Sequence, residues 1–456
     1  MTYQSTNPYT GIVEKTFADH TPAQLEDMLA LADRCFKSDW RHRDFADRAA
    51  VLKRAAALMR ERSEALAEII TKEMGKLIAQ SVGEVALSAA ILDYYADHAA
   101  QFLAPEKLTT PKGEAMVESS PLGVLLGVEP WNYPYYQIAR FAAPNLMAGN
   151  VVMVKQASSV PQCALAFEQI MIEAGAPQGA YTNLFLSNDQ IARLIEDPRV
   201  RAVALTGSEA AGAIVAAQAG KQLKKTTLEL GGSDPFIVLE DADMDKAIKH
   251  AVSGRMGNAG QACTASKRFI VVESVADSFL EKFQSALSHF EPGDPMDKAT
   301  TLAPLSSAQA LKTLLKQVND AVSHGARLVM GGERIAGLEG HFMQPTILTD
   351  IDAENPAFKE EFFGPVALFF RVKDEHAAVE LANDSPFGLG GSVFTQDIEK
   401  GRRIARAIDT GMVFINSGAM SSPELPFGGV KNSGYGRELS GAGILEFVNK
   451  KLIRVN

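Results

Sequence analysis

The sequence predicts a doubly wound α/β protein, and three observations lead to this fold class. Short apolar runs, such as Gly123–Val128 and Val151–Val154, alternate with helix-length segments, as in βαβ units that build an open parallel sheet. The run before Lys155 is apolar at every position, as expected of a parallel strand covered on both faces. A second alternating series runs from about residue 234 to about 420, so we expect two α/β domains.

Local sequence patterns predict the individual helices and strands along the chain. Thr21-Pro22-Ala23-Gln24 is a capping-box pattern that predicts a helix start. Amphipathic segments at about 43–72 and 81–101 predict long helices. The first series continues with strands at 202–205, 226–230 and 236–239 and helices at 161–175 and 209–219; the second contains strands at 268–272, 366–370 and 412–415.

We expect the chain to divide into two domains and an arm. Residues 1–102 and 122–232 are predicted to form a Rossmann-like dinucleotide-binding domain, and 233–432 a catalytic domain. Pro105, Pro111 and Gly113 interrupt a strand-like stretch that could leave the domain body together with the C-terminal tail. We therefore assign 103–121 and 433–456 to an oligomerisation arm and tail, which implies a homodimer or homotetramer.

Composition excludes several classes of protein. The 456 residues are 46% hydrophobic and 22% charged, as in an ordinary globular protein. A net charge of −10 argues against nucleic-acid binding, which needs clustered Lys and Arg. The three cysteines form no paired framework and the eight histidines show no metal-ligand spacing, so neither a disulfide scaffold nor a metal site is expected. No apolar run is long enough for a membrane span, and no signal peptide is recognisable; we expect a cytoplasmic protein.

Cys263 and Glu229 point most directly to chemistry. Cys263 lies in Asn258–Ser266, a stretch of small residues that lets a substrate approach the thiol. Glu229 lies between an apolar run and Gly231-Gly232, where a carboxylate can be held in a dry pocket. A nucleophile and a base are the minimum for covalent catalysis, and a thiol suits this role because its ionised form is accessible near neutral pH.

Four further motifs join this pair. Asn132, in Pro130–Pro134, could donate to an oxyanion, which is typically worth about 3–4 kcal/mol. Lys155 ends a strand, where parallel sheets bind ligands. Leu205–Ser208 opens into a helix whose N–H groups could hold a pyrophosphate. Glu360–Pro365 is a loop-like segment with carboxylates and aromatic side chains.

Taken in order, these motifs resemble the aldehyde dehydrogenase superfamily from end to end, and Pro426–Gly429 and Ser433–Glu438 match as well. The resemblance implies that the Cys263 thiolate attacks an aldehyde, and that the Asn132 amide and the Cys263 N–H hold the oxyanion. Glu229 would then activate the water that hydrolyses the thioester, and Glu438 would lie near the proton path. The implied cofactor-binding residues are Trp131, Lys155, Ser158, Gly207, Ser208, Leu230, Glu361 and Phe363.

Ser158 bears on the choice of cofactor. Many NAD-using relatives have a Glu at the equivalent position, which repels a 2′-phosphate, whereas this chain has an uncharged Ser near Lys155. Removing a carboxylate removes a like-charge penalty against phosphate. We therefore expect NADP to be preferred and NAD to be usable.

Arg140 bears on the choice of substrate. It resembles an Arg that binds the substrate carboxylate in succinate semialdehyde dehydrogenases, and a buried Arg needs a partner that an anionic substrate can supply. Tyr136, Ser421 and Ser422 are the other expected substrate contacts. A second Arg that some of these enzymes carry is replaced by Gly257, so glutarate semialdehyde stays an alternative.

Three other functions fit the sequence less well than oxidation of an aldehyde. A hydrolytic cysteine enzyme needs a His partner, and no His shares a motif with Cys263. A non-catalytic role is compatible with the fold, but such proteins tend to lose the Cys, Asn or Glu that are all present here. Acyl transfer to coenzyme A is disfavoured by Glu229, which favours hydrolysis.

Overall fold

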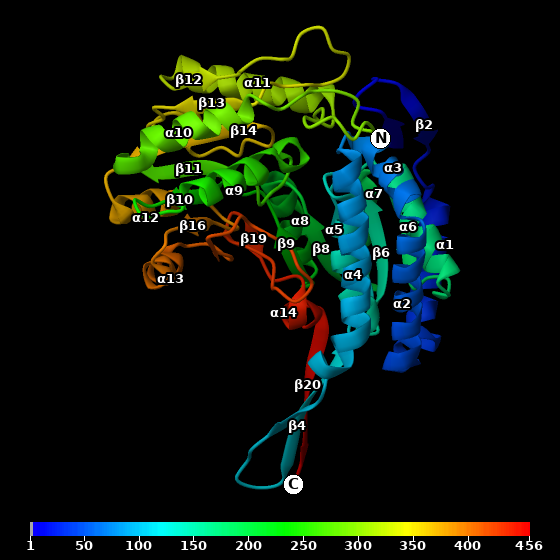
Figure 1. Cartoon of the computed structure of the whole chain (residues 1–456). Helices are drawn as coiled ribbons and strands as arrows, with labels where there is room; N and C mark the ends of the chain where they lie inside the picture. Colours follow the sequence, from blue (N-terminus) through cyan, green and yellow to red (C-terminus); the bar gives the residue numbers. More distant parts are fainter. Residues whose placement is uncertain (1–2) are drawn as a thin grey trace.

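The computed structural model describes residues 3–456. The N-terminal part of this range forms a small hairpin and a set of helices, blue in Figure 1. The elements are β1 (Tyr3–Thr6), β2 (Val13–Phe17), α1 (Pro22–Ser38), α2 (Phe45–Glu61), α3 (Ser63–Met74) and α4 (Ile78–Phe102). The capping box at Thr21 is present, which confirms the predicted helix start. The long helix predicted at 43–72 is two helices, because the chain leaves helical geometry at Arg62 (φ −113°, ψ 21°).

A six-stranded sheet follows, with the strand order β19-β9-β8-β5-β6-β7. Its strands are β5 (Val124–Glu129), β6 (Val151–Gln156), β7 (Tyr181–Asn183), β8 (Val200–Thr206), β9 (Lys225–Glu229) and β19 (Gly434–Tyr435). All neighbours are parallel except β19. The chain winds outward from β5 through β6 to β7 and then returns to β8 on the other side of β5. This reversal creates a switch point between β5 and β8, where open α/β sheets bind ligands.

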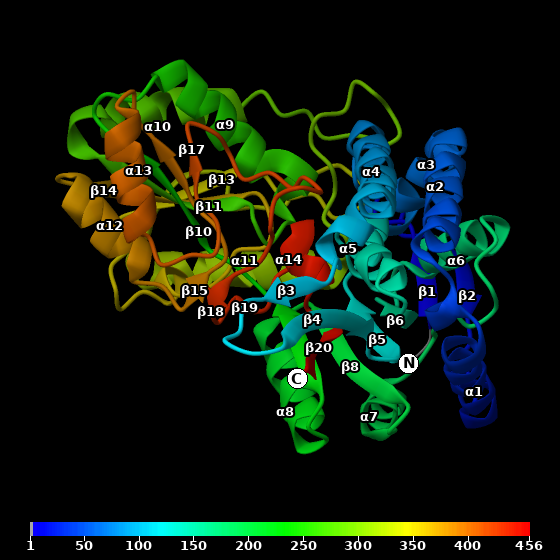
Figure 2. The ribbon, with the colours of Figure 1, turned by 90° about the horizontal axis from the view of Figure 1, so that it is seen from below.

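Helices cover both faces of this sheet (Figure 2). They are α5 (Pro134–Met147) and α6 (Pro161–Glu173), with α1, α7 (Asn188–Glu196) and α8 (Glu209–Lys221) on the opposite face. Every residue of β6 is buried, which confirms the prediction made from its unbroken apolar pattern.

A second sheet has the order β12-β13-β14-β11-β10-β16-β17. Its strands are β10 (Asp234–Val238), β11 (Ser266–Val272), β12 (Arg327–Met330), β13 (Thr346–Thr349), β14 (Val366–Val372), β16 (Ser392–Phe394) and β17 (Phe414–Ile415). Its helices are α9 (Met244–Met256), α10 (Glu273–Leu287), α11 (Ala308–Ser323), α12 (Glu375–Asn383) and α13 (Ile398–Ala407). Residues 236–239, which continue the first series along the chain, pair with β11 in this second sheet. Counting this strand in the first series was wrong, whereas a second series that starts near residue 234 fits the structure, because the chain crosses between the sheets at Gly231-Gly232.

The predicted arm is a narrow three-stranded sheet of β3 (Glu106–Leu108), β4 (Glu114–Pro121) and β20 (Val448–Val455). It extends away from both helix-covered sheets and carries the C-terminus at its tip (Figure 1). The rest of the predicted tail stays on the body, since β19 pairs with β9 and α14 (Ser440–Ile444) packs on α4. A short antiparallel pair of β15 (Phe387–Gly388) and β18 (Val430–Lys431) completes the strands. The doubly wound fold is confirmed, and the exact domain boundaries stay a prediction.

Candidate active site

Cys263 follows a sharp reversal of the chain after α9. Asn258 and Ala259 adopt left-handed φ values of 53° and 52°, which is uncommon for residues other than glycine. The loop is then held from behind by Lys267 at the start of β11. The Lys267 Nζ atom donates to the main-chain oxygens of Ala262, at 2.9 Å, and Cys263, at 2.7 Å. The nucleophile loop is therefore held by a buried cation that the sequence did not single out.

Cys263 lies where two cavities meet. The strand-end cavity, about 290 Å³, lies beyond the carboxyl ends of β5, β8 and β9 and is lined by Cys263 and Gln137 together with Pro130–Asn132, Thr206–Ser208, Glu229–Gly231, Glu361 and Phe363. The α5 cavity, about 200 Å³, has Cys263 and Gln137 in its wall as well. Its other lining residues are Leu87, Tyr133, Tyr136, Arg140, Ala262, Thr264, Ala419, Met420, Ser421 and Phe427. A reagent in either cavity can therefore reach the same thiol.

The structure brings together most of the residues predicted from the sequence. Those in the strand-end cavity are Trp131, Asn132, Gly207, Ser208, Glu229, Leu230, Glu361 and Phe363. Those in the α5 cavity are Tyr136, Arg140 and Ser421. Lys155, Ser158, Ser422 and Glu438 line neither cavity. Gln137 was missed, although its position three residues before Arg140 on one helix places both on the same side of α5.

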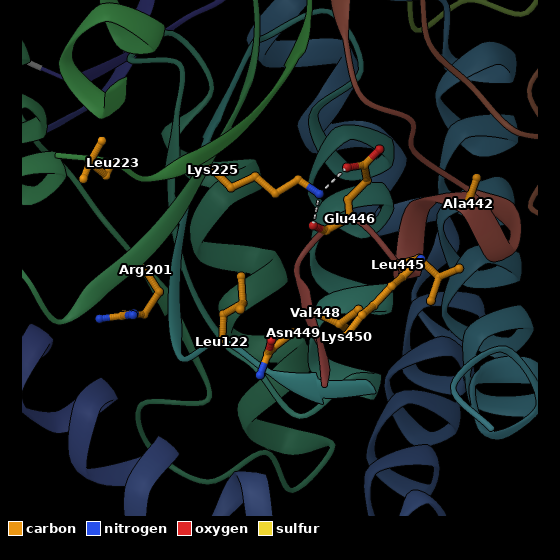
Figure 3. Close-up of a pocket in the computed structure, with 10 residues that line it drawn as sticks. All are labelled: Leu122, Arg201, Leu223, Lys225, Ala442, Leu445, Glu446, Val448, Asn449 and Lys450. Atoms are coloured by element: carbon orange, nitrogen blue, oxygen red, sulfur yellow. Dashed lines mark hydrogen bonds and ion pairs between the residues drawn. The ribbon is translucent and has the colours of Figure 1, made fainter. Parts of the chain in front are cut away.

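A larger cavity lies elsewhere in the molecule. It measures about 680 Å³ and lies at the base of the arm, beside residues 448–450 of β20 and the amino ends of β8 and β9 (Figure 3). Its wall contains an ion pair between Lys225 and Glu446, at 2.8 Å, and none of the residues predicted for the site. Size alone therefore does not mark the reactive centre in this protein.

The thiol of Cys263 is protonated at neutral pH in this environment. Burial raises the pKa of Cys263 to about 12, and the positive charges of Arg140 and Lys267 offset only part of this rise. The expectation that the thiolate is accessible near neutral pH was wrong for this state, because enclosure in protein disfavours the charged form. The site must therefore supply a base for the thiol.

Glu229 has the properties of that base. Its side chain is buried at the end of β9, and neither carboxylate oxygen has a hydrogen-bond partner within residues 3–456. Burial raises the pKa of Glu229 well above its ordinary value, and the nearby Glu438 raises it further. A β-carbon on Gly428 would lie only 2.5 Å from Glu229 Oε1, so the glycine leaves room for the carboxylate.

Asn132 is held at both its main chain and its side chain. The Nδ2 atom donates to the Gln261 main-chain oxygen at 3.1 Å. The Asn132 main-chain oxygen accepts from Lys76 Nζ at 2.8 Å and from Asn258 Nδ2 at 3.0 Å. An amide nitrogen carries two N–H groups, so one stays available for an oxygen in the strand-end cavity.

Arg140 is fully buried on α5 and already has an anionic partner. Its guanidinium forms an ion pair with Glu438 and donates to Tyr136 Oη and Thr206 Oγ1, both at 3.2 Å. It also stacks on the ring of Phe427. The partner that a buried Arg needs is therefore already supplied by Glu438, which neutralises the charge within the protein, so burial of Arg140 does not by itself indicate an anionic substrate.

Glu361 and Phe363 are fixed at the far side of the strand-end cavity. Glu361 Oε1 accepts from the Gly232 N–H at 3.0 Å and lies 3.1 Å from Lys267 Nζ. The ring of Phe363 meets Trp131 edge to face, with 5.8 Å between centroids. These contacts tie the loop before β14 to the loop after β5, one from each sheet.

Lys155 and Ser158 lie beyond the cavity at the end of β6. Burial lowers the pKa of Lys155, and its ammonium lies 5.9 Å from the ring centroid of Tyr3. The Ser158 main-chain oxygen accepts from the Gln4 N–H at 2.9 Å. The N-terminal hairpin therefore packs beside this predicted cofactor region.

The fold and the cavities are those of an oxidoreductase, with a thiol in the wall of a cavity at a strand edge of the dinucleotide-binding kind. Residues 1–453 match the model of the aldehyde dehydrogenase family. The chain belongs to this family.

Individual relatives cover nearly the whole chain. A succinate-semialdehyde dehydrogenase [NADP(+)] of Deinococcus radiodurans is 52% identical over 452 residues, covering 99% of this chain and 94% of that protein. The succinate semialdehyde dehydrogenase [NAD(P)+] Sad of Escherichia coli is 44% identical, covering 98% and 96%. Among solved structures, the succinic semialdehyde dehydrogenase of Streptococcus pyogenes in complex with NADP+ is 50% identical, with a TM-score of 0.98 and 99% of each chain covered.

Proposed function

We propose that this protein oxidises succinate semialdehyde to succinate with NADP, and that NAD also serves. The observation that carries the proposal is the position of Cys263 between two cavities. One of them lies at the switch point of the first sheet, where dinucleotides bind, and the other contains Arg140. The relatives described above support the substrate and the cofactor.

The first half of the reaction makes a bond between Cys263 and the aldehyde carbon. Glu229, in the wall of the same cavity, takes the thiol proton, and Sγ attacks the carbonyl carbon. The free N–H of Asn132 Nδ2 and the Cys263 N–H then hold the oxyanion, as preorganised donors do in acyl transfer. The bound nicotinamide ring would accept the hydride, which leaves a thioester on Cys263.

The second half breaks the same bond. Glu229 first releases the proton it took from Cys263 to solvent, and as a carboxylate it then takes a proton from a water molecule, whose oxygen attacks the thioester carbon. The tetrahedral oxyanion is held by the same two donors, and its collapse expels the Cys263 sulfur and releases the carboxylic acid. Burial suits Glu229 to this work, because a raised pKa makes a carboxylate a stronger base.

The residues of the strand-end cavity fit a dinucleotide. Ser208 caps α8 through a hydrogen bond from the Ala211 N–H, and the first N–H groups of a helix lack acceptors within it and favour phosphate. Gly207 and Leu230 shape the adjoining wall, and Glu361, Trp131 and Phe363 would surround the nicotinamide ribose. Lys155 and Ser158 would face the adenosine ribose, where the absence of a carboxylate at residue 158 tolerates a 2′-phosphate.

The α5 cavity fits a short aldehyde with a carboxylate. Arg140 would face the carboxylate, aided by the hydroxyls of Tyr136, Ser421 and Ser422. Tyr136 Oη lies 3.0 Å from Ser421 Oγ, so these hydroxyls already form a polar patch beside Arg140. Glu438 would keep Arg140 oriented and share its charge.

We further propose a homodimer or homotetramer located in the cytoplasm. The arm presents an edge strand, β20, with the exposed side chains of Leu452 and Val455, and an edge strand is a template for pairing with another chain. Cys35, Cys163 and Cys263 are all free thiols, as is usual in a reducing compartment.

A panel of aldehydes tests the proposal. Succinate semialdehyde, glutarate semialdehyde and butanal are compared with NADP and with NAD, and kcat/KM is measured from reduced cofactor. Succinate semialdehyde with NADP should give the highest value, and Cys263→Ala should have no activity. A preference for butanal, or a hundredfold preference for NAD, would contradict the proposal.

A further inference from the structure

Lys76 is a fully buried lysine behind the oxyanion donor. It follows Gly75, the left-handed cap of α3, and its side chain has no exposed surface. Its ammonium pairs with Glu84 of α4, donates to the Asn132 main-chain oxygen at 2.8 Å and lies 3.6 Å from the ring centroid of Tyr133. All three directions of the ammonium are therefore occupied by specific partners.

Glu84 extends this contact to α5. Its Oε1 atom accepts from the N–H groups of Tyr135, at 2.9 Å, and Tyr136, at 3.3 Å. These groups belong to the first turn of α5, whose N–H groups have no acceptor within the helix. The Lys76–Glu84 pair therefore holds the chain on both sides of Pro134, with Asn132 before it and α5 after it.

A second donor, Asn258, connects Asn132 to the loop that carries Cys263, the nucleophile loop. Asn258 Nδ2 donates to the main-chain oxygens of Asn132, at 3.0 Å, and Gln261, at 3.1 Å. Asn132 Nδ2 donates to the same Gln261 oxygen. Three hydrogen bonds from two side-chain amides thus join the residue that would hold the oxyanion to the loop that carries Cys263.

We propose that Lys76 is a positioning residue for Asn132: it fixes the peptide of Asn132 so that the free side-chain N–H faces the carbonyl oxygen of an aldehyde at Cys263. This inference rests on the proposed function, in which Asn132 stabilises the oxyanion. A buried ammonium is costly unless it is paired and hydrogen-bonded. A hydrophobic side chain would fill the same space at lower cost, so orientation of Asn132 is the gain that explains the charge.

The test variant is Lys76→Met combined with Glu84→Gln. The pair of changes leaves no lone charge in the interior, and the Gln oxygen can still accept from the first turn of α5. Misplacement of a catalytic group by about 1 Å can cost about a hundredfold in rate, so we expect the acylation rate, measured as the NADPH burst, to fall about 10- to 100-fold. Arg48→Met removes another buried cation, which lies beside Gly149 near the amino end of β6 and thus at the opposite edge of the sheet from the site; it is the matched control and should keep its burst.

Two measurements distinguish a loss of the correct position of Asn132 from a general loss of active-site structure. Alkylation of Cys263 by iodoacetamide forms no oxyanion, so its rate should stay within about twofold of wild type. In an Asn132→Ala background the same Lys76/Glu84 change should have almost no further effect on acylation, because residues that act through one another are not additive. A multiplicative loss in that background, an equal loss of alkylation or an undiminished burst would overturn the inference.

A second variant covers the case in which the double variant does not fold. Asn258→Gly suits the left-handed backbone at that residue and deletes the other donor to the Asn132 oxygen. It should lower the burst rate in the wild-type background but not in Asn132→Ala, and equal effects in both would refute the link. These comparisons between the wild-type and Asn132→Ala backgrounds use the aldehyde that wild type oxidises fastest. A wrong substrate assignment therefore shows in the aldehyde panel, whereas a wrong positioning role shows only in the comparisons between backgrounds.

Discussion

Arg140 gives the sharpest prediction, because the structure assigns it both a structural partner and a place in the α5 cavity. Arg140→Met removes the guanidinium and leaves Glu438 buried without its cation. Removing one member of a buried ion pair costs about 3–5 kcal/mol of stability. A second change, Glu438→Gln, removes the buried negative charge that has lost its partner, so the double variant should recover part of the lost stability.

The effect on substrate choice can be separated from this loss of stability. A hydrogen bond to a charged group contributes about 1.5–3 kcal/mol, and each 1.4 kcal/mol corresponds to about a factor of ten. Loss of Arg140 should therefore lower the ratio of kcat/KM for succinate semialdehyde to that for butanal by about 10- to 150-fold. Butanal has the same number of carbons but no carboxylate.

The assay measures both aldehydes on one enzyme preparation, so the fraction of folded protein cancels from the ratio. Chemical denaturation of the same preparations gives the free energy of unfolding. Arg140→Met and Arg140→Met/Glu438→Gln should show the same reduced ratio and different stabilities, whereas Glu438→Gln alone keeps the guanidinium and removes the anion that shares its charge, so its ratio should not fall below that of wild type. Equal losses for the two aldehydes in the Arg140 variants would refute a role in carboxylate recognition.

Three further substitutions test the role of Glu229 as a base, the choice between NADP and NAD, and the space around Glu229. Glu229→Gln should abolish steady-state turnover but keep a slower NADPH burst. The burst should accelerate at high pH as Cys263 ionises, because burial raises the pKa of Cys263 to about 12. In wild type, the rate of thioester hydrolysis should rise with pH through the raised pKa of Glu229, because only the carboxylate can take a proton from water. Ser158→Glu should lower kcat/KM for NADP relative to NAD by about tenfold or more, since an adjacent carboxylate repels the 2′-phosphate. Gly428→Ala places a β-carbon 2.5 Å from Glu229 Oε1 and should slow hydrolysis of the thioester, whereas Gly83→Ala, which meets nothing within 4 Å, is the control expected to leave the rate unchanged.

The strands and their ligand-binding edge were predictable because local patterns report them. An unbroken apolar run indicates a strand buried on both faces, as at β6, and the residues just after such runs reach the carboxyl edge of the sheet. Asn132, Thr206 and Glu229 occupy that edge for this reason. The apolar pattern of residues 236–239 did not by itself assign that strand to one sheet, because nothing local distinguishes a strand of one parallel sheet from a strand of the next.

The supporting residues were missed because their partners are far away in sequence. Lys76 follows a glycine at a helix end, where a lysine is ordinarily solvated and interacts with the last carbonyls. Its contact with Asn132 spans 56 residues, and that of Asn258 spans 126. Such contacts exist only after the helical layer, the first sheet and the nucleophile loop have packed together, so no pattern in one segment contains them.

In the proposed mechanism, the charges around Cys263 explain why Glu229 would act in both halves of the reaction. Arg140 lowers the pKa of Cys263, but Glu438 already neutralises this guanidinium, and Glu229 and Glu361 raise the thiol pKa further. A substrate carboxylate bound at Arg140 adds another negative charge near the sulfur and opposes ionisation still more. Arg140 therefore cannot both recognise an anionic substrate and generate the thiolate, and the thiol proton must pass to a base in the wall of the same cavity. Glu229 is buried there, and neither of its oxygens has a hydrogen-bond partner within residues 3–456. The carboxylate that we propose to activate water is therefore also placed to activate the thiol.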